Sequence, residues 1–121
     1  MKKFFIFLIL IFLCKPAFSA TRLHTEKYYQ NLWAKEHNAQ TECTLKDKSR
    51  VDCVTENYAL EVDFADKWAE AIGQSLYYGL CLNKKPAILL IMENCPKDIK
   101  HLNKLTKVAQ TYGIKIFTIC P

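Results

Sequence analysis

The chain has 121 residues, and half of them are apolar. This length supports one small domain, and the apolar content excludes an intrinsically disordered chain. With 3 Gly and 4 Pro, the composition also excludes collagen-like and low-complexity sequence. The 17 Lys and Arg against 12 Asp and Glu give a net charge of +5, which favours a polyanionic partner such as nucleic acid or an anionic membrane.

The N-terminal segment has the pattern of a secretory signal peptide. Two lysines precede an uncharged apolar run over residues 4–14, which is followed by Pro16 and small residues. The run is shorter than a bilayer span requires. We expect residues 1–19 to be cleaved after Ser19, so that residues 20–121 reach the periplasm or the medium without a membrane attachment. The alternative is that the segment is retained as an anchor.

Removal of this segment changes the charge and the cysteine count. Residues 20–121 hold 14 basic and 12 acidic side chains, a net charge of +2, because the segment carries three lysines and no acid. They also hold five cysteines, and an odd number leaves at least one free or paired with another chain. No CxxC spacing is present, so a cysteine metal site is not expected.

The hydrophobic pattern predicts one domain in which helices and strands alternate. Leu23, Tyr28, Leu32 and Trp33 recur with a period near 3.6 and predict an amphipathic helix over 24–38. Polar clusters then separate three short apolar runs, which predict an antiparallel meander. The further predicted elements are strands over 41–45, 50–55 and 58–64, a helix over 67–82 with Asp66 as its N-cap, a buried strand over 87–92, a helix over 96–112 ended by Gly113, and a strand over 114–119. The fold class is therefore α/β, with a mixed central sheet flanked by helices.

The cysteines suggest one disulfide in this sheet. Cys95 and Cys120 each follow an apolar strand, and the ends of two parallel strands meet at one edge of a sheet. We therefore expect a bridge between Cys95 and Cys120, and a second bridge between Cys43 and Cys53 is compatible with the first two strands. Cys81 is then free, and its helical position without a neighbouring His is more typical of a core residue than of a nucleophile.

The second and third predicted strands form a hairpin with an acidic face. A turn at 55–58 places Asp52 opposite Glu61 and Arg50 opposite Asp63, and these four side chains share one face because side chains alternate along a strand. The other face is the predicted core, formed by Val51, Cys53, Leu60 and Val62. Opposed carboxylates need a cation, a nearby base such as Arg50, or a shared proton. They suit an oxygen site for Mg²⁺ or Mn²⁺, and the alternative is an exposed face whose acids are solvated.

The following helix adds a polar stripe beside this face. Lys67, Glu70, Gln74 and Tyr78 recur at helical spacing, and the short connection from Asp63 places Lys67 beside the end of the third strand. We expect Lys67 to reach the carboxylates. The alternative is a surface helix whose apolar residues pack inward while its polar residues are solvated.

The segments Arg50–Asp52, Leu60–Asp63 and Gln74–Tyr78 resemble the motifs of the PD-(D/E)xK nuclease superfamily. The resemblance implies an αβββαβ core, here with an added αβ unit, and a restriction-endonuclease-like, magnesium- or manganese-dependent hydrolysis of phosphodiester bonds in DNA or RNA. Asp52 and Glu61 resemble the two metal-binding acids. Asp63 stands where the motif has Lys, and Lys67 is the candidate for the missing amine.

The resemblance also implies supporting residues. Gln74 and Tyr78 resemble helix residues that support the site or contact the DNA backbone. Glu42 resembles a further acid of the first helix or strand, because pairing Cys43 with Cys53 in register would place Glu42 on the face of Asp52. Arg50 and Glu70 lie beside the same face.

Two functions follow from this resemblance. The first is an exported nuclease with nucleic acid as its partner, whose catalytic residues are Asp52, Glu61, Asp63, Lys67 and Gln74. The second is a catalytically degenerate nuclease fold that serves as a secreted binding module, which the missing motif Lys and the low net charge of residues 20–121 favour. A structural protein with a chance acidic face is the remaining alternative.

Overall fold

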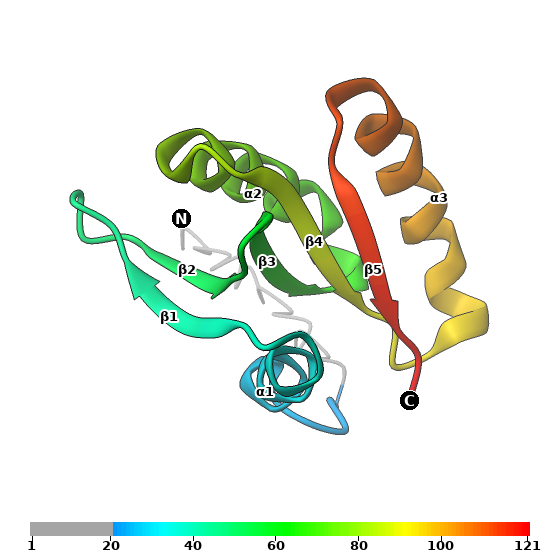
Figure 1. Cartoon of the computed structure of the whole chain (residues 1–121). Coiled ribbons are helices and arrows are strands. Elements are labelled where there is room, and N and C mark those ends of the chain that lie inside the picture. Colours follow the sequence, from blue (N-terminus) through cyan, green and yellow to red (C-terminus); the bar gives the residue numbers. More distant parts are fainter. Residues whose placement is uncertain (1–20) are drawn as a thin grey trace, which may run out of the picture.

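Five strands form one mixed sheet in the order β1-β2-β3-β4-β5 (Figure 1). The computed structural model describes residues 21–121, and the predicted signal peptide over 1–19 lies outside the described residues. The first three strands pair antiparallel and the last three pair parallel. The strands are β1 (Gln40–Thr44), β2 (Arg50–Val54), β3 (Tyr58–Phe64), β4 (Lys85–Ile91) and β5 (Lys115–Ile119).

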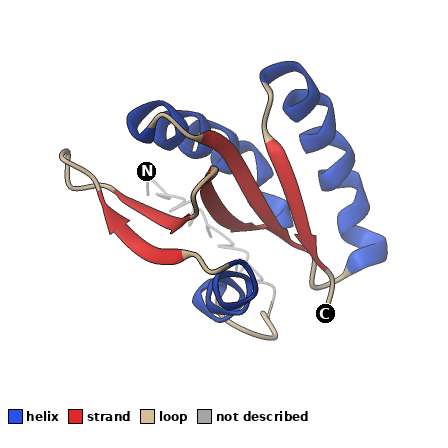
Figure 2. Cartoon of the chain, in the orientation of Figure 1, coloured by secondary structure: helices blue, strands red, loops and turns tan. Residues whose placement is uncertain are grey.

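Helices cover both faces of the sheet, so the described part of the chain has three layers (Figure 2). One face packs on α1 (Glu26–His37), and the other packs on α2 (Trp68–Leu82), which the short 3₁₀ helix η1 (Ala65–Lys67) precedes, and on α3 (Cys95–Tyr112). Alternate residues of β4 supply the two cores, with Leu89 toward α1 and Leu90 toward α2 and α3. The predicted α/β class is confirmed.

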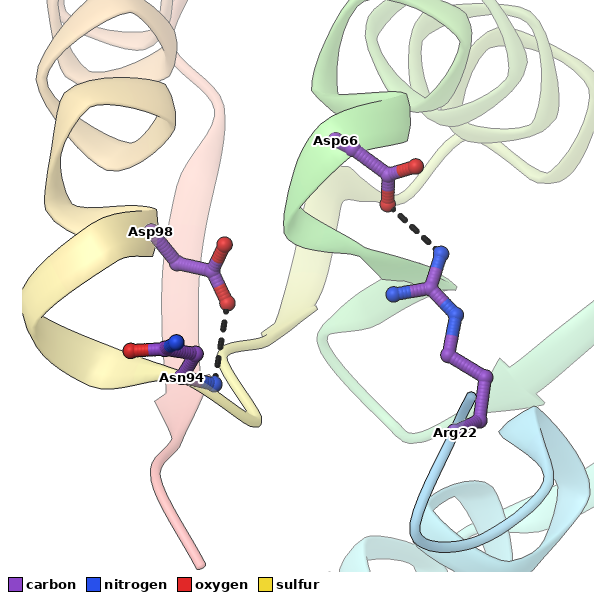
Figure 3. Close-up of polar contacts among 4 residues, drawn as sticks. All are labelled: Arg22, Asp66, Asn94 and Asp98. Carbon is purple, nitrogen blue, oxygen red and sulfur yellow. Dashed lines mark hydrogen bonds and ion pairs between the residues drawn. The ribbon is translucent and has the colours of Figure 1, made fainter. Parts of the chain in front are cut away.

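Local sequence signals explain where the helices begin and end. Asn94 caps α3 through its side chain, which accepts the Lys97 N–H, and Gly113 ends the helix at φ 68°. Figure 3 shows the Asn94 backbone N–H donating to the Asp98 carboxylate. The prediction that Asp66 caps α2 is wrong. Asp66 lies within η1 and accepts a hydrogen bond from Arg22 Nη2 at 2.8 Å (Figure 3).

The first helix buries only part of the predicted apolar face, because Trp33 is buried as predicted whereas Leu23, Tyr28 and Leu32 are exposed. Tyr28 and Leu32 are 43% and 41% exposed, and the buried residues of α1 include Tyr29, Gln30 and Trp33. The buried face therefore keeps Trp33 but is turned from Tyr28 and Leu32 toward Tyr29 and Gln30, since successive residues of a helix lie about 100° apart. This rotation matters because it turns Gln30 toward the strands.

The predicted hairpin register is confirmed at its base, where Cys53 pairs with Leu60 and Val54 with Ala59. The ladder between β2 and β3 consists of these two pairs and ends there. The prediction that Val51 shares a core with Cys53 and Leu60 is wrong, because Val51 packs with Ala59 and with Tyr78 of α2. β2 separates from β3 at Asp52. Because of this separation, Val51 and Cys53 no longer lie on the same face of the sheet.

The predicted disulfide between Cys95 and Cys120 is present, with a Cα–Cα distance of 6.0 Å. It joins the start of α3 to the residue after β5. The second bridge is not formed, because Cys43 pairs in register with Val51 rather than with Cys53, and both cysteines are free. Cys81 is also free but exposed, so its assignment to the core is wrong.

Within residues 21–121, no helix has the length and apolar character that crossing a membrane requires.

Candidate functional site

Asp52 and Glu61 meet where β2 and β3 separate. Asp52 Oδ2 accepts the Val62 backbone N–H at 2.8 Å. This N–H lies beyond the last residue pair of the β2–β3 ladder, so the carboxylate takes the place of a strand carbonyl. The separation of the two strands therefore creates the position in which Asp52 is held beside Glu61.

Glu61 is 4% exposed, because its side chain lies on the face of the sheet that α2 covers. Its buried Oε1 has no hydrogen-bond donor among the described residues. Burial and the neighbouring Asp52 charge raise the pKa of Glu61 well above its usual range. Burial also raises the pKa of Asp52, against the Val62 N–H that stabilises its ionised form. The pair therefore shares a proton at neutral pH, or it needs a cation.

Asp63 extends this acidic group along β3. It is 7% exposed, and burial together with the Glu26, Asp52 and Glu70 carboxylates raises its pKa to about 7. Glu26 comes from the first turn of α1, and burial and the Asp52 charge raise its pKa as well. Glu26 is not predicted from the sequence as a site residue, since an acid in a first helical turn is usually explained by the helix dipole.

Lys67 is the basic residue whose charge acts on both Asp63 and Glu26. It is exposed at the end of η1, and its charge opposes the rise in the pKa of both acids. The expected approach of Lys67 to the carboxylates therefore agrees with its place in the fold. Glu70, exposed on the first turn of α2, adds negative charge near Asp63.

Gln30 of α1 joins β1 and β2 beside the site through its side-chain amide. This buried amide donates from Nε2 to Glu42 Oε1 at 3.1 Å and to the Asp52 backbone carbonyl at 3.1 Å. Glu42 is half-buried and also lies 3.7 Å from Arg50 Nη1. Glu42 adopts φ 54° within β1, a left-handed conformation that non-glycine residues rarely adopt. The expectation that Glu42 and Arg50 lie beside Asp52 agrees with these contacts, but Arg50 pairs with Glu42 and not with Asp63.

Gln74 and Tyr78 lie on α2 above the acidic group. Tyr78 is buried, and burial followed by the Glu61 charge raises its pKa. Gln74 is exposed and lies beside the Tyr78 hydroxyl. Tyr78 therefore forms part of the wall over Glu61, and Gln74 stands closer to solvent.

The donor set suits magnesium or manganese coordination by two carboxylates. The described residues contain no group of three or more His, Cys, Asp or Glu side chains arranged to hold a metal ion. Mg²⁺ usually keeps several water ligands and binds through one or two carboxylates together with substrate phosphates. The unpartnered Glu61 Oε1 and the second oxygen of Asp52 are two such donors. Asp52 and Glu61 are therefore the residues that would hold the ion.

No protein-family model, curated protein or solved structure matches the chain.

Proposed function

We propose that this protein is a metal-dependent nuclease that hydrolyses phosphodiester bonds of DNA or RNA. The observation that carries the proposal is the Asp52–Glu61 pair, where the buried Glu61 carboxyl lies beside the half-buried carboxyl of Asp52 and Glu61 Oε1 has no donor among the described residues. Burying this oxygen costs free energy unless a proton shared with Asp52 or a cation compensates it. A divalent cation would satisfy both carboxylates.

The two acids would each offer one oxygen to the ion, and Asp52 also holds β3 through its other oxygen. Asp52 keeps one oxygen on the Val62 N–H and offers the other, which fixes its orientation before a cation arrives. Glu61 offers Oε1 from beneath α2. When bound, Mg²⁺ or Mn²⁺ supplies Lewis acidity that lowers the pKa of water and offsets negative charge on a phosphate.

Lys67 would supply the amine that the motif lysine supplies in the superfamily. It reaches the acidic group from the end of η1, whereas the motif position on β3 holds Asp63. An ammonium near the ion positions the attacking water or the phosphate through charge and hydrogen bonding. Gln74 supports the substrate from α2, and Asp63 adjusts the charge around Lys67.

A catalytically degenerate binding module is the second candidate. The observation that favours it is Asp63 itself, which adds a third acid where the motif has a base. In this case the protein would bind a cation or a nucleic acid without cleaving it. The cleavage experiment below separates the two candidates.

We also place the protein outside the cytoplasm, in the periplasm or the medium. The Cys95–Cys120 disulfide supports this location, because such bonds persist in oxidising compartments. The signal-peptide pattern of residues 1–19 supports it as well.

The experiment is a nicking assay with purified residues 20–121 and supercoiled plasmid. We expect nicked and linear products with Mg²⁺ or Mn²⁺ and none with EDTA. Asp52→Asn should reduce the cleavage rate by at least about 100-fold. This factor is the upper end of the losses seen when residues around a bound metal are changed. Glu36→Gln, an exposed position on α1, is the matched control and should cut like the wild type. Absence of cleavage of plasmid and of an RNA transcript under all these conditions would favour the binding module.

A further inference from the structure

Asp52 lies where the ladders on both sides of β2 are interrupted. The β1–β2 ladder pairs the residues that flank Glu42 and Asp52 but omits these two, which stand opposite each other. The β2–β3 ladder ends one residue away, at Cys53. The Asp52 backbone carbonyl instead accepts a hydrogen bond from Gln30 Nε2 of α1 at 3.1 Å. A buried side chain therefore takes the place of a neighbouring strand at this residue.

Gln30 also holds the strained residue opposite Asp52. Glu42 has φ 54°, a left-handed conformation that costs free energy in a residue other than Gly and persists only when surrounding contacts support it. Gln30 Nε2 donates to Glu42 Oε1 at 3.1 Å, and Arg50 Nη1 lies 3.7 Å from Glu42 Oε2. One amide therefore fastens both members of the interrupted Glu42–Asp52 position to α1.

The chemistry of this position suits an amide. The Gln30 side chain is 2% exposed, and its two partners, a carboxylate oxygen and a backbone carbonyl, only accept hydrogen bonds. An amide nitrogen offers two N–H groups, one for each acceptor, whereas an ionised carboxylate or a thioether offers none. A buried polar group whose donors are all used makes the structure around it rigid. Gln30 therefore does more than fill space beneath the strands.

Asp52 is consequently held at two points. The Val62 N–H holds one carboxylate oxygen from β3, and Gln30 holds the backbone carbonyl from α1. The first bond orients the side chain, and the second orients the peptide group to which that side chain is attached. The second carboxylate oxygen, which the proposed function assigns to a cation, therefore has a defined position.

We propose that Gln30 is a positioning residue for the cation site, which fixes the direction of the free Asp52 oxygen through the Asp52 carbonyl and not by contact with the cation. This inference rests on the proposed function and adds a residue of α1 to its site. Groups that orient a metal ligand typically contribute about 10- to 100-fold to metal affinity. Since Gln30 acts through the backbone of Asp52, we expect an effect at the lower end, about tenfold.

The test is the dissociation constant of Mn²⁺, obtained from the electron paramagnetic resonance signal of free Mn²⁺ in titrations of residues 20–121. Gln30→Met keeps the length and burial of the side chain but removes both N–H groups. We expect it to bind Mn²⁺ about tenfold more weakly than the wild type, at a temperature at which circular dichroism shows both to be folded. Gln110→Met, the same substitution at an exposed position of α3, is the matched control and should bind like the wild type.

Exchange of two side chains separates the positioning of Asp52 from the attachment of α1 to β1, and it provides a second variant should Gln30→Met not fold. In Gln30→Glu/Glu42→Gln, the amide at position 42 donates to the carboxylate at position 30, while the Asp52 carbonyl has no donor. Glu42→Gln alone is the reference, because its amide oxygen still accepts from Gln30. Although the double variant carries one more negative charge than the reference, we expect it to bind Mn²⁺ about tenfold more weakly.

Three results would overturn this inference and leave the proposed function standing. They are equal Mn²⁺ affinities of Gln30→Met and the wild type, equal affinities of the double variant and Glu42→Gln, or an equal loss of affinity in Gln110→Met. Absence of Mn²⁺ binding by the wild type would overturn both proposals. If Mn²⁺ binding depends on Gln30 but the wild type cuts neither plasmid nor RNA with Mn²⁺, the positioning role is supported and the nuclease proposal fails.

Discussion

The Asp52 carboxylate accepts the Val62 backbone N–H at 2.8 Å, just beyond the last residue pair that joins β2 to β3. This bond satisfies a backbone donor that the separating strands leave without a carbonyl. It also fixes one Asp52 oxygen and leaves the other for a ligand. The same side chain therefore holds the two strands together at the opening and forms half of the candidate site with Glu61.

Substitutions at Asp52 should separate these two roles. Asp52→Ala leaves the Val62 N–H without its partner in a half-buried position, which should lower the free energy of unfolding by about 1–3 kcal/mol. Asp52→Asn keeps an oxygen that can accept the same N–H and should lose less stability. Urea unfolding followed by circular dichroism measures both. Equal stability of the alanine variant and the wild type would show that the bond does not support the strand opening.

The raised pKa of Asp63 predicts how stability depends on pH. A carboxyl group whose pKa rises from 3.8 unfolded to about 7 folded favours the folded state at low pH, and this contribution is lost as pH rises through about 7. Asp63→Asn, which cannot ionise, should therefore be more stable than the wild type at pH 8, by an amount on the order of 2 kcal/mol. Near pH 4 the two should be similar.

The control for this prediction is Glu36→Gln, which removes an exposed acid of α1. Thermal unfolding without metal, measured from pH 4 to pH 8, gives the difference between each variant and the wild type. A difference for Asp63→Asn that is constant across this range would contradict the assignment of Asp63 as a neutralised buried acid.

The sequence predicted those parts of the fold that depend on local signals. A short polar turn fixes the register of the hairpin at Cys53 and Leu60, and Gly113 ends α3 because it accepts φ 68°. The Cys95–Cys120 bridge followed from parallel strands ending at one edge. Each of these features is decided by residues close in sequence or by simple strand geometry.

The parts that the sequence did not predict depend on tertiary packing. Alternation along β3 separates Glu61 and Asp63 from the apolar residues, and such acids are usually exposed, so nothing local indicates that α2 covers them. The buried face of α1 is predicted correctly at Trp33 and wrongly at Tyr28 and Leu32, which are apolar yet exposed. Glu26 could not be assigned to the site, since its position depends on how α1 crosses the sheet.

Metal binding should release protons at neutral pH. In the metal-free protein Glu61 holds a proton because its pKa is raised by burial and by Asp52, and a bound cation requires the ionised form. Isothermal titration of Mg²⁺ or Mn²⁺ at pH 7 in PIPES and in Tris should give different apparent enthalpies, because the released protons are taken up by buffers that differ in ionisation enthalpy. The affinity should increase with pH. Identical enthalpies in the two buffers would contradict a protonated Glu61.

The central claim is that Asp52 and Glu61 form a metal-dependent site for phosphodiester hydrolysis, and the most direct measurement is the single-turnover cleavage rate of Glu61→Gln on labelled duplex DNA with Mg²⁺. The glutamine keeps the shape of the side chain and the burial under α2, so the variant should fold, as circular dichroism will verify. We predict a rate at least about 100-fold below that of the wild type, with Glu36→Gln unchanged. A Glu61→Gln variant that cuts as fast as the wild type, in the same metal-dependent way, would contradict the account.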